Sequence, residues 1–225
     1  VESMRGSVNN WLGDLLSADL YVAAEDFDEG ARLPATVVTE VAGLGTVATL
    51  SRYRDRILPL ADRRVELIGA SLATESRKGY ALLSSSSSTW QEFDAGSVLV
   101  SEPLAYHLGL RSGSRLELPT PHGPLQVRVA AVFRDYASEH GRIILDETFY
   151  LQHWPEQPVK TLALFAGNGD IESMRREVSE LAARHSVVMT PAAAILEESM
   201  AVFDRTFRDT DVLRVVSLIV ACIGV

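Results

Sequence analysis

The chain of 225 residues is poor in cysteine and lysine: Cys222 is its single cysteine, and its only lysines are Lys78 and Lys160. One cysteine excludes an internal disulfide framework and a metal site made of several cysteines. The net charge is −9 and the 21 basic residues form no cluster, which argues against nucleic-acid binding and against a polybasic lipid-binding segment. Residues 1–11 lack the apolar run of a signal peptide, so export would require a targeting element upstream of Val1.

The overall composition is that of a globular protein. Hydrophobic residues make up 47% of the chain and aromatic residues 7%, which is enough for a substantial core. Disordered and collagen-like classes are therefore excluded. The length allows one large domain or two small ones.

Residues 191–225 have the pattern of one long helix. Pro191 is a favourable first helical residue because its missing N–H would have no partner there, and no helix breaker follows before Gly224. Such a helix would be about 50 Å long. Residues 192–211 are mixed and charged, whereas residues 212–225, VLRVVSLIVACIGV, are almost wholly apolar. A membrane span needs about 20 apolar residues, so we interpret the chain as an external domain of a larger membrane protein that ends within the start of a span.

Helical and alternating periodicities predict helices and strands on both sides of a β-rich middle. The expected helices cover residues 7–17, 34–42, 102–108 and 146–154, with a further one capped by Asp170, and the expected strands cover residues 18–24, 46–60, 63–70, 97–101, 115–118, 125–133, 142–145, 159–166 and 186–189. This order predicts an α+β fold, in which a discontinuous α/β domain made from both ends of the chain carries an inserted β-rich module.

The main low-complexity segment is the run of five serines at residues 84–88. Polar residues that cannot bury a surface usually form a flexible loop. We therefore predict an irregular stretch over residues 72–96 that marks a domain boundary.

Two groups of residues with possible chemistry have simpler structural interpretations. The sequence GLGTVA at residues 43–48 matches G-x-G-x-x-A, but it follows an expected helix and precedes an expected strand, the reverse of the order that dinucleotide binding requires. We interpret it as a helix stop and turn. A second group lacks the spacing of metal ligands or of a hydrolase, and we interpret its members as solvated loop and helix-cap residues. These are Asp135, Glu139, His140, Asp146, Glu147 and His153.

Residues 97–154 resemble the extracytoplasmic domain of MacB/FtsX-like ABC-transporter permeases. The similarity is carried by the run SVLVSEPLAYHLGLRSGSRLELP, the strand VRVAAVFRD and the segment RIILDETFYLQHW. The opening WLGDLLSADLYV is similar to the stretch after the first membrane helix of these permeases, and DTDVLRVVSLIVACIGV to the entry of the second.

The resemblance implies a porter-like α/β subdomain from residues 1–72 and 158–200, an inserted β-rich, sabre-like subdomain from residues 73–157, and an exit helix with the start of a membrane span at residues 201–225. It further implies a domain on the periplasmic side of a bacterial inner membrane. Its partners would be a cytoplasmic ABC ATPase subunit, a second permease copy and a periplasmic protein or a lipid or other hydrophobic substrate. No Walker A loop is present, so this chain is expected to bind no nucleotide by that means, and no cofactor or catalytic residue is predicted.

The mechanism that the resemblance implies is mechanical: ATP-driven tilting of membrane helices would be carried outward by the helix after Pro191. Trp11 would lie at the membrane interface or pack against the exit helix, and Arg214 would reach the outer headgroups. The predicted membrane-coupling residues are Trp11, Leu12, Leu16, Leu196, Phe203, Phe207, Leu213 and Arg214. Two alternatives remain, a passive periplasmic ligand-binding or sensor module and an exported hydrolase.

Overall fold

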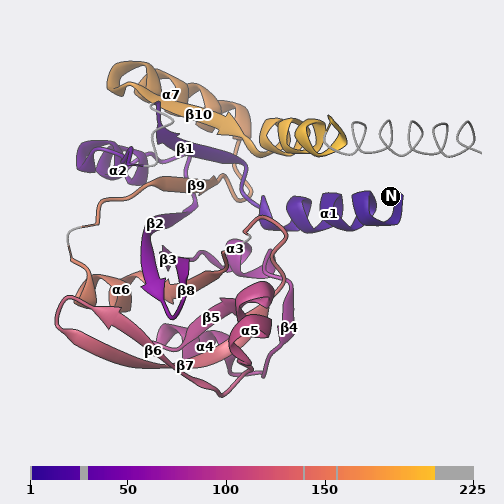
Figure 1. Ribbon diagram of the computed structural model, residues 1–225. Coiled ribbons are helices and arrows are strands. Elements are labelled where there is room, and N and C mark those ends of the chain that lie inside the picture. Colours follow the sequence, from indigo (N-terminus) through magenta and orange to yellow (C-terminus); the bar gives the residue numbers. More distant parts are fainter. Residues whose placement is uncertain (1, 26–29, 139, 156, 206–225) are drawn as a thin grey trace, which may run out of the picture.

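The computed structural model describes residues 2–25, 30–138, 140–155 and 157–205. Within them, ten strands form one mixed sheet in the order β10-β1-β9-β2-β3-β8-β5-β7-β4, and β6 pairs with β7 beside this path (Figure 1). The strands are β1 (Leu20–Ala24), β2 (Thr49–Leu60), β3 (Arg63–Ser71), β4 (Leu82–Ser84), β5 (Val98–Ser101), β6 (Arg115–Thr120), β7 (Gly123–Phe133), β8 (Arg142–Asp146), β9 (Thr161–Phe165) and β10 (Val187–Pro191). The helices are α1 (Glu2–Leu15), α2 (Ala35–Ala42), α3 (Thr74–Lys78), α4 (Thr89–Asp94), α5 (Glu102–Leu108), α6 (Glu147–His153) and α7 (Ile171–His185).

The antiparallel group β10-β1-β9 lies in the upper part of Figure 1. Buried side chains of α2 and α7 join those of these strands in one core, so the two helices cover this part of the sheet. In α7, Met174, Val178 and Leu181 share the buried helical face. The side chain of Asp170 accepts a hydrogen bond from Glu172 N at 2.9 Å, which confirms the predicted cap.

β2 and β3 form a long hairpin that joins the two parts of the sheet. β2 pairs with β9, and β3 pairs in parallel with β8. The turn holds Ala61 in the left-handed region at φ 53°. The hairpin confirms the two β-segments predicted on either side of residues 61–62.

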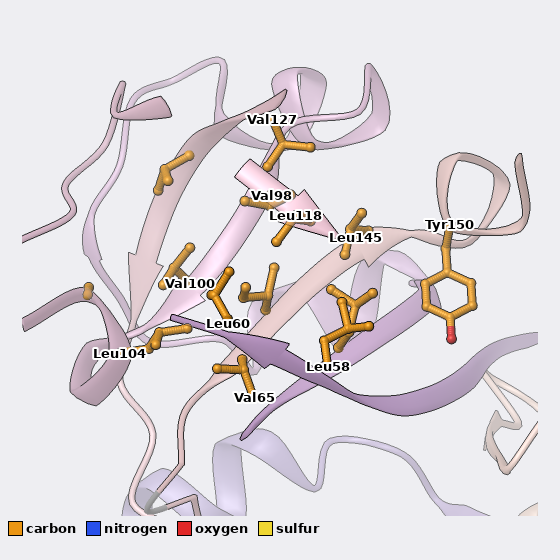
Figure 2. Close-up of a cluster of buried hydrophobic side chains, with 14 of the residues drawn as sticks. Leu58, Leu60, Val65, Val98, Val100, Leu104, Leu118, Val127, Leu145 and Tyr150 are labelled. Atoms are coloured by element: carbon orange, nitrogen blue, oxygen red, sulfur yellow. The ribbon is translucent and has the colours of Figure 1, made fainter. Parts of the chain in front are cut away.

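The second part of the sheet, β8-β5-β7-β4, contributes to two hydrophobic cores. In the larger one, Leu58, Leu60 and Val65 from the β2–β3 hairpin meet Val98 and Val100 of β5 (Figure 2). Fully burying one such side chain contributes about 1.5–3 kcal/mol. This cluster therefore fixes how the hairpin packs against β5 and its neighbours.

α6 crosses β3 at a glycine. A Cβ atom added at Gly69 would lie 2.4 Å from Cγ of Tyr150, whose ring is fully buried. A residue without a side chain is therefore required for this close approach.

The stretch over residues 72–96 is not irregular, contrary to the prediction, because it holds α3, β4 and α4. The serine run is itself ordered by hydrogen bonds: Ser86 N donates to Thr89 Oγ1 at 2.9 Å, and Ser88 Oγ donates to Glu92 at 2.7 Å. The elements have 5, 3 and 6 residues, too few for a periodic pattern to predict them.

A further helix, called the C-terminal helix below, covers residues 192–205. Pro191 pairs with Leu20 as the last residue of β10, so it stands directly before this helix instead of at its first position. Among the described residues, no helix combines the length and the apolar character that crossing a membrane requires. Three predicted coupling residues lie outside the described residues: Phe207, Leu213 and Arg214.

The mixed sheet with its flanking helices confirms the predicted α+β fold class. The order of elements also agrees with the predicted interpretation of residues 43–48, since Gly43 ends α2 and β2 follows. The subdomain boundaries at residues 72–73 and 157–158 stay a prediction.

Candidate functional site

α1 and the C-terminal helix join the sheet at neighbouring points. α1 leads into β1 and β10 leads into the C-terminal helix, and these strands are antiparallel neighbours in which Leu20 pairs with Pro191. Across this junction, Ala192 N donates to the backbone oxygen of Asp19 at 3.4 Å. Figure 1 shows the two helices extending side by side from the same edge of the fold. Both helices are therefore attached to the same pair of strands.

An ion pair joins the two helices far from this junction. Arg5 Nε and Nη2 donate to Asp204 Oδ1 and Oδ2 at 2.7 and 2.9 Å, the two-bond geometry that fixes orientation as well as distance. The hydrogen bond and the charge of Asp204 raise the pKa of the Arg5 guanidinium. Asp204 lies about 18 Å along the helix from residue 192 at 1.5 Å per residue. The helices are therefore tied together at two separated levels.

Each helix of the pair has one shielded face. In α1, Val8 and Trp11 are buried. In the C-terminal helix, Met200 is 6% exposed and Leu196 and Phe203 are partly buried at the helical spacings of four and three residues. The pair is therefore amphipathic, with charged residues on the open side.

Trp11 fixes α1 to the loop after β7. Its residue exposure is 8%, and its indole Nε1 donates to Arg134 O at 3.0 Å. Its ring meets the ring of Tyr136 edge-on with centroids 5.3 Å apart. Trp11 therefore packs against the domain's own loop, and its predicted role in membrane coupling stays a prediction.

The carboxyl end of α1 is held by two further contacts. A Cβ atom at Gly79 would lie 2.3 Å from Asp14 O, so the glycine that ends α3 allows close contact with the α1 backbone. After α1, the carboxylate of Asp19 accepts a hydrogen bond from Ala166 N at 2.8 Å. α1 is thus attached to β9, α3 and the loop after β7.

The sequence-predicted coupling residues fall into two groups. Trp11, Leu12 and Leu16 lie at the attached end of α1 and beyond it, and the last two are partly buried. Leu196 and Phe203 lie on the shielded face of the C-terminal helix. Sequence reasoning missed Arg5, Asp204 and Met200, although the i, i+4, i+7 spacing of Leu196, Met200 and Phe203 was a usable signal for the last.

A cavity of about 380 Å³ lies at the attached end of α1. We call it the α1 cavity. α1 and the residue after it supply Trp11, Leu15 and Leu16 to its wall, and its floor is one face of the central sheet, where residues from neighbouring strands point to the same side. Floor and remaining walls are formed by Tyr21, Tyr53, Arg54, Asp55, Glu66, Ile68, Tyr80, Phe133, Arg134, Asp135, Arg142, Ile144, Lys160 and Thr161.

Burial keeps three tyrosines of this cavity neutral. It raises the pKa of Tyr21, Tyr53 and Tyr80 above the ordinary value, because the phenolate form loses its hydration there. Their hydroxyls therefore stay uncharged to a higher pH than the hydroxyl of a tyrosine in water.

The guanidinium of Arg142 forms ion pairs with two carboxylates at one end of the cavity. Arg142 Nε donates to Glu66 Oε2 at 2.6 Å, and Arg142 Nη1 lies 3.5 Å from Asp135 Oδ1. Burial alone would lower the pKa of Arg142, but the charges of Glu66 and Asp135 outweigh it and raise that pKa. The side chain of Asp135 is fully shielded from solvent.

Glu147 forms a second buried charge cluster, at the junction of β8 and α6. It is 6% exposed and accepts hydrogen bonds from Arg52 Nε at 2.8 Å and Arg54 Nε at 2.9 Å. Glu147 and Asp135 are therefore buried and paired with arginines, which corrects their prediction as solvated residues. Asp146 does cap α6, as predicted, by accepting from Thr148 N at 2.9 Å.

The remaining residues of the predicted acidic and histidine group do not converge. His140 is exposed, and the ring of His153 meets the ring of Phe149 edge-on within α6. Glu139 lies outside the described residues. In the described part of the chain, no three His, Cys, Asp or Glu side chains gather as a metal ion would require.

The chain is similar in sequence to an uncharacterized ABC transporter permease protein of Mycobacterium tuberculosis. The two are 32% identical over the whole of this chain, which spans only 28% of the relative's length. No family model matches the chain.

Solved structures share its fold at low sequence identity. The periplasmic region of MacB from Actinobacillus actinomycetemcomitans has a TM-score of 0.58 at 10% identity, covering 83% of this chain and 94% of that one. The extracellular domain of the noncanonic ABC-type transporter YknZ from Gram-positive bacteria has a TM-score of 0.54 at 12% identity, covering 76% and 98%. These likenesses, with the similarity to the mycobacterial permease, confirm the predicted resemblance to the extracytoplasmic domain of MacB/FtsX-like ABC permeases.

Proposed function

We propose that this chain is the external domain of an ABC-transporter permease subunit and that it transmits ATP-driven motion of membrane helices to the periplasmic side. The permease relationship rests on the mycobacterial relative and on the shared fold. The transmission step is an inference from the helix pair. Its partners would be a cytoplasmic ATPase subunit and a second permease copy, and its cargo a protein, a lipid or another hydrophobic substrate.

The helix pair carries this proposal. α1 and the C-terminal helix enter adjacent antiparallel strands and are joined by the Arg5–Asp204 ion pair. A helix transmits displacement along its axis because its backbone hydrogen bonds resist bending, whereas an irregular linker absorbs it. Motion that reaches residue 205 or residue 2 would therefore arrive at β10 and β1 together.

In this proposal, the motion would pass from β1 across the sheet through paired strands. β1 and β9 are paired, β9 and β2 are paired, and the β2–β3 hairpin continues into β8. The Glu147 cluster adds a charged connection between β2 and α6. A displacement at the helix pair would thus also move the second part of the sheet, β8-β5-β7-β4, which lies in the lower part of Figure 1.

The test is a break in the C-terminal helix of the full-length permease assembled with its ATPase. Proline inside a helix costs about 3 kcal/mol and kinks it. We choose Glu197→Pro, because Glu197 is exposed and lies within the helix. The matched control is Ala193→Pro, because proline in the first helical turn removes no intrahelical hydrogen bond.

Motion is read as a distance between spin labels on the two permease copies. Tyr106 is 92% exposed on α5 and accepts a label after Tyr106→Cys, in a full-length permease from which Cys222 and any other cysteine have been removed. We expect ATP to change the label-to-label distance fully in the parent and in Ala193→Pro, and by clearly less in Glu197→Pro, where only α1 remains unbroken, at similar ATPase rates. An undiminished ATP-dependent change in Glu197→Pro would refute transmission through this helix.

A further inference from the structure

The charged side chains around the α1 cavity are already paired within the protein. Arg142 faces Glu66 and Asp135, and the Asp135 side chain has no exposed surface, so a ligand in the cavity does not reach it. The other three cations of the lining have carboxylate partners as well: the ion pairs are Lys160–Asp55, Arg54–Glu147 and Arg134–Glu102. Every charge of the lining therefore has an opposite charge beside it, and none selects a charged ligand.

The surface that the lining presents to the cavity is mostly apolar. α1 and the residue after it contribute Trp11, Leu15 and Leu16, and the sheet contributes Ile68 and Ile144. Moving a charged head from water to such a surface is costly unless the head gains a partner there. Apolar groups, in contrast, gain free energy by leaving water. The cavity thus favours an uncharged ligand with an apolar body.

Five aromatic rings line the cavity: those of Trp11, Tyr21, Tyr53, Tyr80 and Phe133. Tyr80 and Phe133 already meet edge-on, with centroids 5.6 Å apart. Aromatic rings prefer such edge-to-face or offset contacts with further rings, which an aromatic ligand supplies. The volume of about 380 Å³ lies near the lower end of the range of small-molecule sites, ~300–1,000 Å³. One ring with a short chain therefore suits this space.

The hydroxyl of Tyr80 has no hydrogen-bond partner among the described residues. Unlike Asp135, Tyr80 is only partly buried, and it lines the cavity. A hydroxyl can both donate and accept a hydrogen bond, and one that is shielded from water without a partner costs free energy. A hydroxyl or carbonyl group of a ligand would supply the missing partner without bringing a charge into the cavity.

We propose that the α1 cavity binds a small uncharged aromatic molecule of about a dozen non-hydrogen atoms, whose single hydroxyl or carbonyl group forms a hydrogen bond with the hydroxyl of Tyr80. The aromatic body lies between α1 and the sheet, against Trp11 and Ile68. A charged head of either sign is disfavoured, because it gives up its hydration and finds the charges of the lining already paired. This binding site goes beyond the proposed transmission of motion and does not depend on it.

Three probes with one body and different heads test the selection of an uncharged ligand. They are 4-phenylbutanol, 4-phenylbutylamine and 4-phenylbutyrate, of which the last two are charged at pH 7. Each is titrated into the isotope-labelled 225-residue chain and followed by NMR. The alcohol should bind with a Kd of about 1 mM or below, and at least about tenfold more tightly than either charged probe. Equal binding of all three probes, tighter binding of a charged one, or no binding of the alcohol would overturn the proposal.

The indole signals of two tryptophans locate the bound alcohol in the parent chain. Trp11 lines the cavity, whereas Trp154 belongs to the larger hydrophobic core. The signal of Trp11 should therefore shift as the alcohol binds, and that of Trp154 should stay in place. A shift of the Trp154 signal with an unchanged Trp11 signal would put the alcohol elsewhere and refute the assignment of the cavity.

Two variants test the contacts. Tyr80→Phe keeps the ring and removes the hydroxyl, so the affinity for the alcohol should fall about threefold to tenfold. Ile68→Trp fills the floor of the cavity, so the alcohol should be excluded. Tyr106→Phe is the matched control and should bind as the parent does, because Tyr106 is 92% exposed and does not line the cavity.

Folding of each variant is checked by its thermal midpoint before binding is compared. If Ile68→Trp does not fold, Tyr80→Phe and the Trp11 signal of the parent decide. Unchanged affinity for the alcohol in folded Tyr80→Phe, or binding that folded Ile68→Trp leaves intact, would overturn the proposal.

Discussion

Replacing Glu147 with glutamine should destabilise the fold strongly, although sequence patterns place this residue on the surface. The side chain of Glu147 is 7% exposed, and its two oxygens take hydrogen bonds from Arg52 and Arg54. Arg54 also donates to Gln157 O, so the cluster joins β2 to the segment that follows α6. Glutamine has nearly the same shape, which isolates the loss of charge and of one acceptor.

The expected loss of stability depends on how exposed the two arginines that pair with Glu147 are. Removing one member of a buried ion pair costs about 3–5 kcal/mol, because the other charge is left uncompensated. The side chain of Arg54 is 15% exposed, but that of Arg52 is 36% exposed and regains some hydration. We therefore expect a loss of about 2–4 kcal/mol in the free energy of unfolding, or about 5–15 °C in Tm for a chain of this length.

Urea and thermal unfolding followed by far-ultraviolet circular dichroism measure this loss. The urea midpoint should fall with an unchanged m-value, since compactness is not altered. Glu117→Gln on β6 is the matched control, because Glu117 is exposed, and its effect should stay within about 0.5 kcal/mol. If the Tm of Glu147→Gln lay within about 2 °C of this control, the view of the cluster as a buried connection would be refuted.

Two further substitutions test single contacts. Tyr150→Phe removes a buried hydroxyl that has no hydrogen-bond partner among the described residues, so stability at pH 7 should stay equal or rise by about 1 kcal/mol, and a clear loss would contradict this. Burial raises the pKa of Tyr150 to about 12 from 10.0, so above about pH 10 the tyrosine ionises more readily in the unfolded chain, and the stability of the wild-type protein falls as the pH rises toward 12. Tyr150→Phe has no group that ionises there, so it should be less sensitive to alkaline unfolding in a circular-dichroism titration. Trp11→Phe removes the hydrogen bond to Arg134 O at a cost of about 0.5–1.5 kcal/mol, and hydrogen exchange should quicken in α1 but not in α7, whereas unchanged exchange in α1 would show that this contact does not hold the helix.

Much of the fold could be predicted from local patterns, because they were long enough to be read. Alternation over residues 125–133 predicted most of β7, and the helical spacing from Ile171 predicted α7 with its Asp170 cap. The order of elements around residues 43–48 correctly favoured a turn over a phosphate loop. Each of these signals depends on neighbours in the sequence, and the structure confirms them.

The candidate sites could not be predicted in this way, because their members are distant in sequence. Glu147 is 95 residues from Arg52 and 93 from Arg54, and Arg5 is 199 residues from Asp204. A carboxylate read alone is assigned to the surface, where most carboxylates lie. Only the pairing of β2 with β3, and of β3 with β8, brings these arginines to the start of α6.

The helix pair and the α1 cavity meet at one loop, the one after β7. Arg134 O accepts the hydrogen bond from Trp11, and Arg134 and the next residue, Asp135, both line the cavity. Since Trp11, Leu15 and Leu16 form part of the cavity wall, a shift of α1 must change the cavity. A ligand that prefers one position of α1 would bias that position by the same factor by which the position alters its affinity. Glu197→Pro changes no residue of the cavity wall, so a loss of motion in this variant would not come from an altered cavity lining.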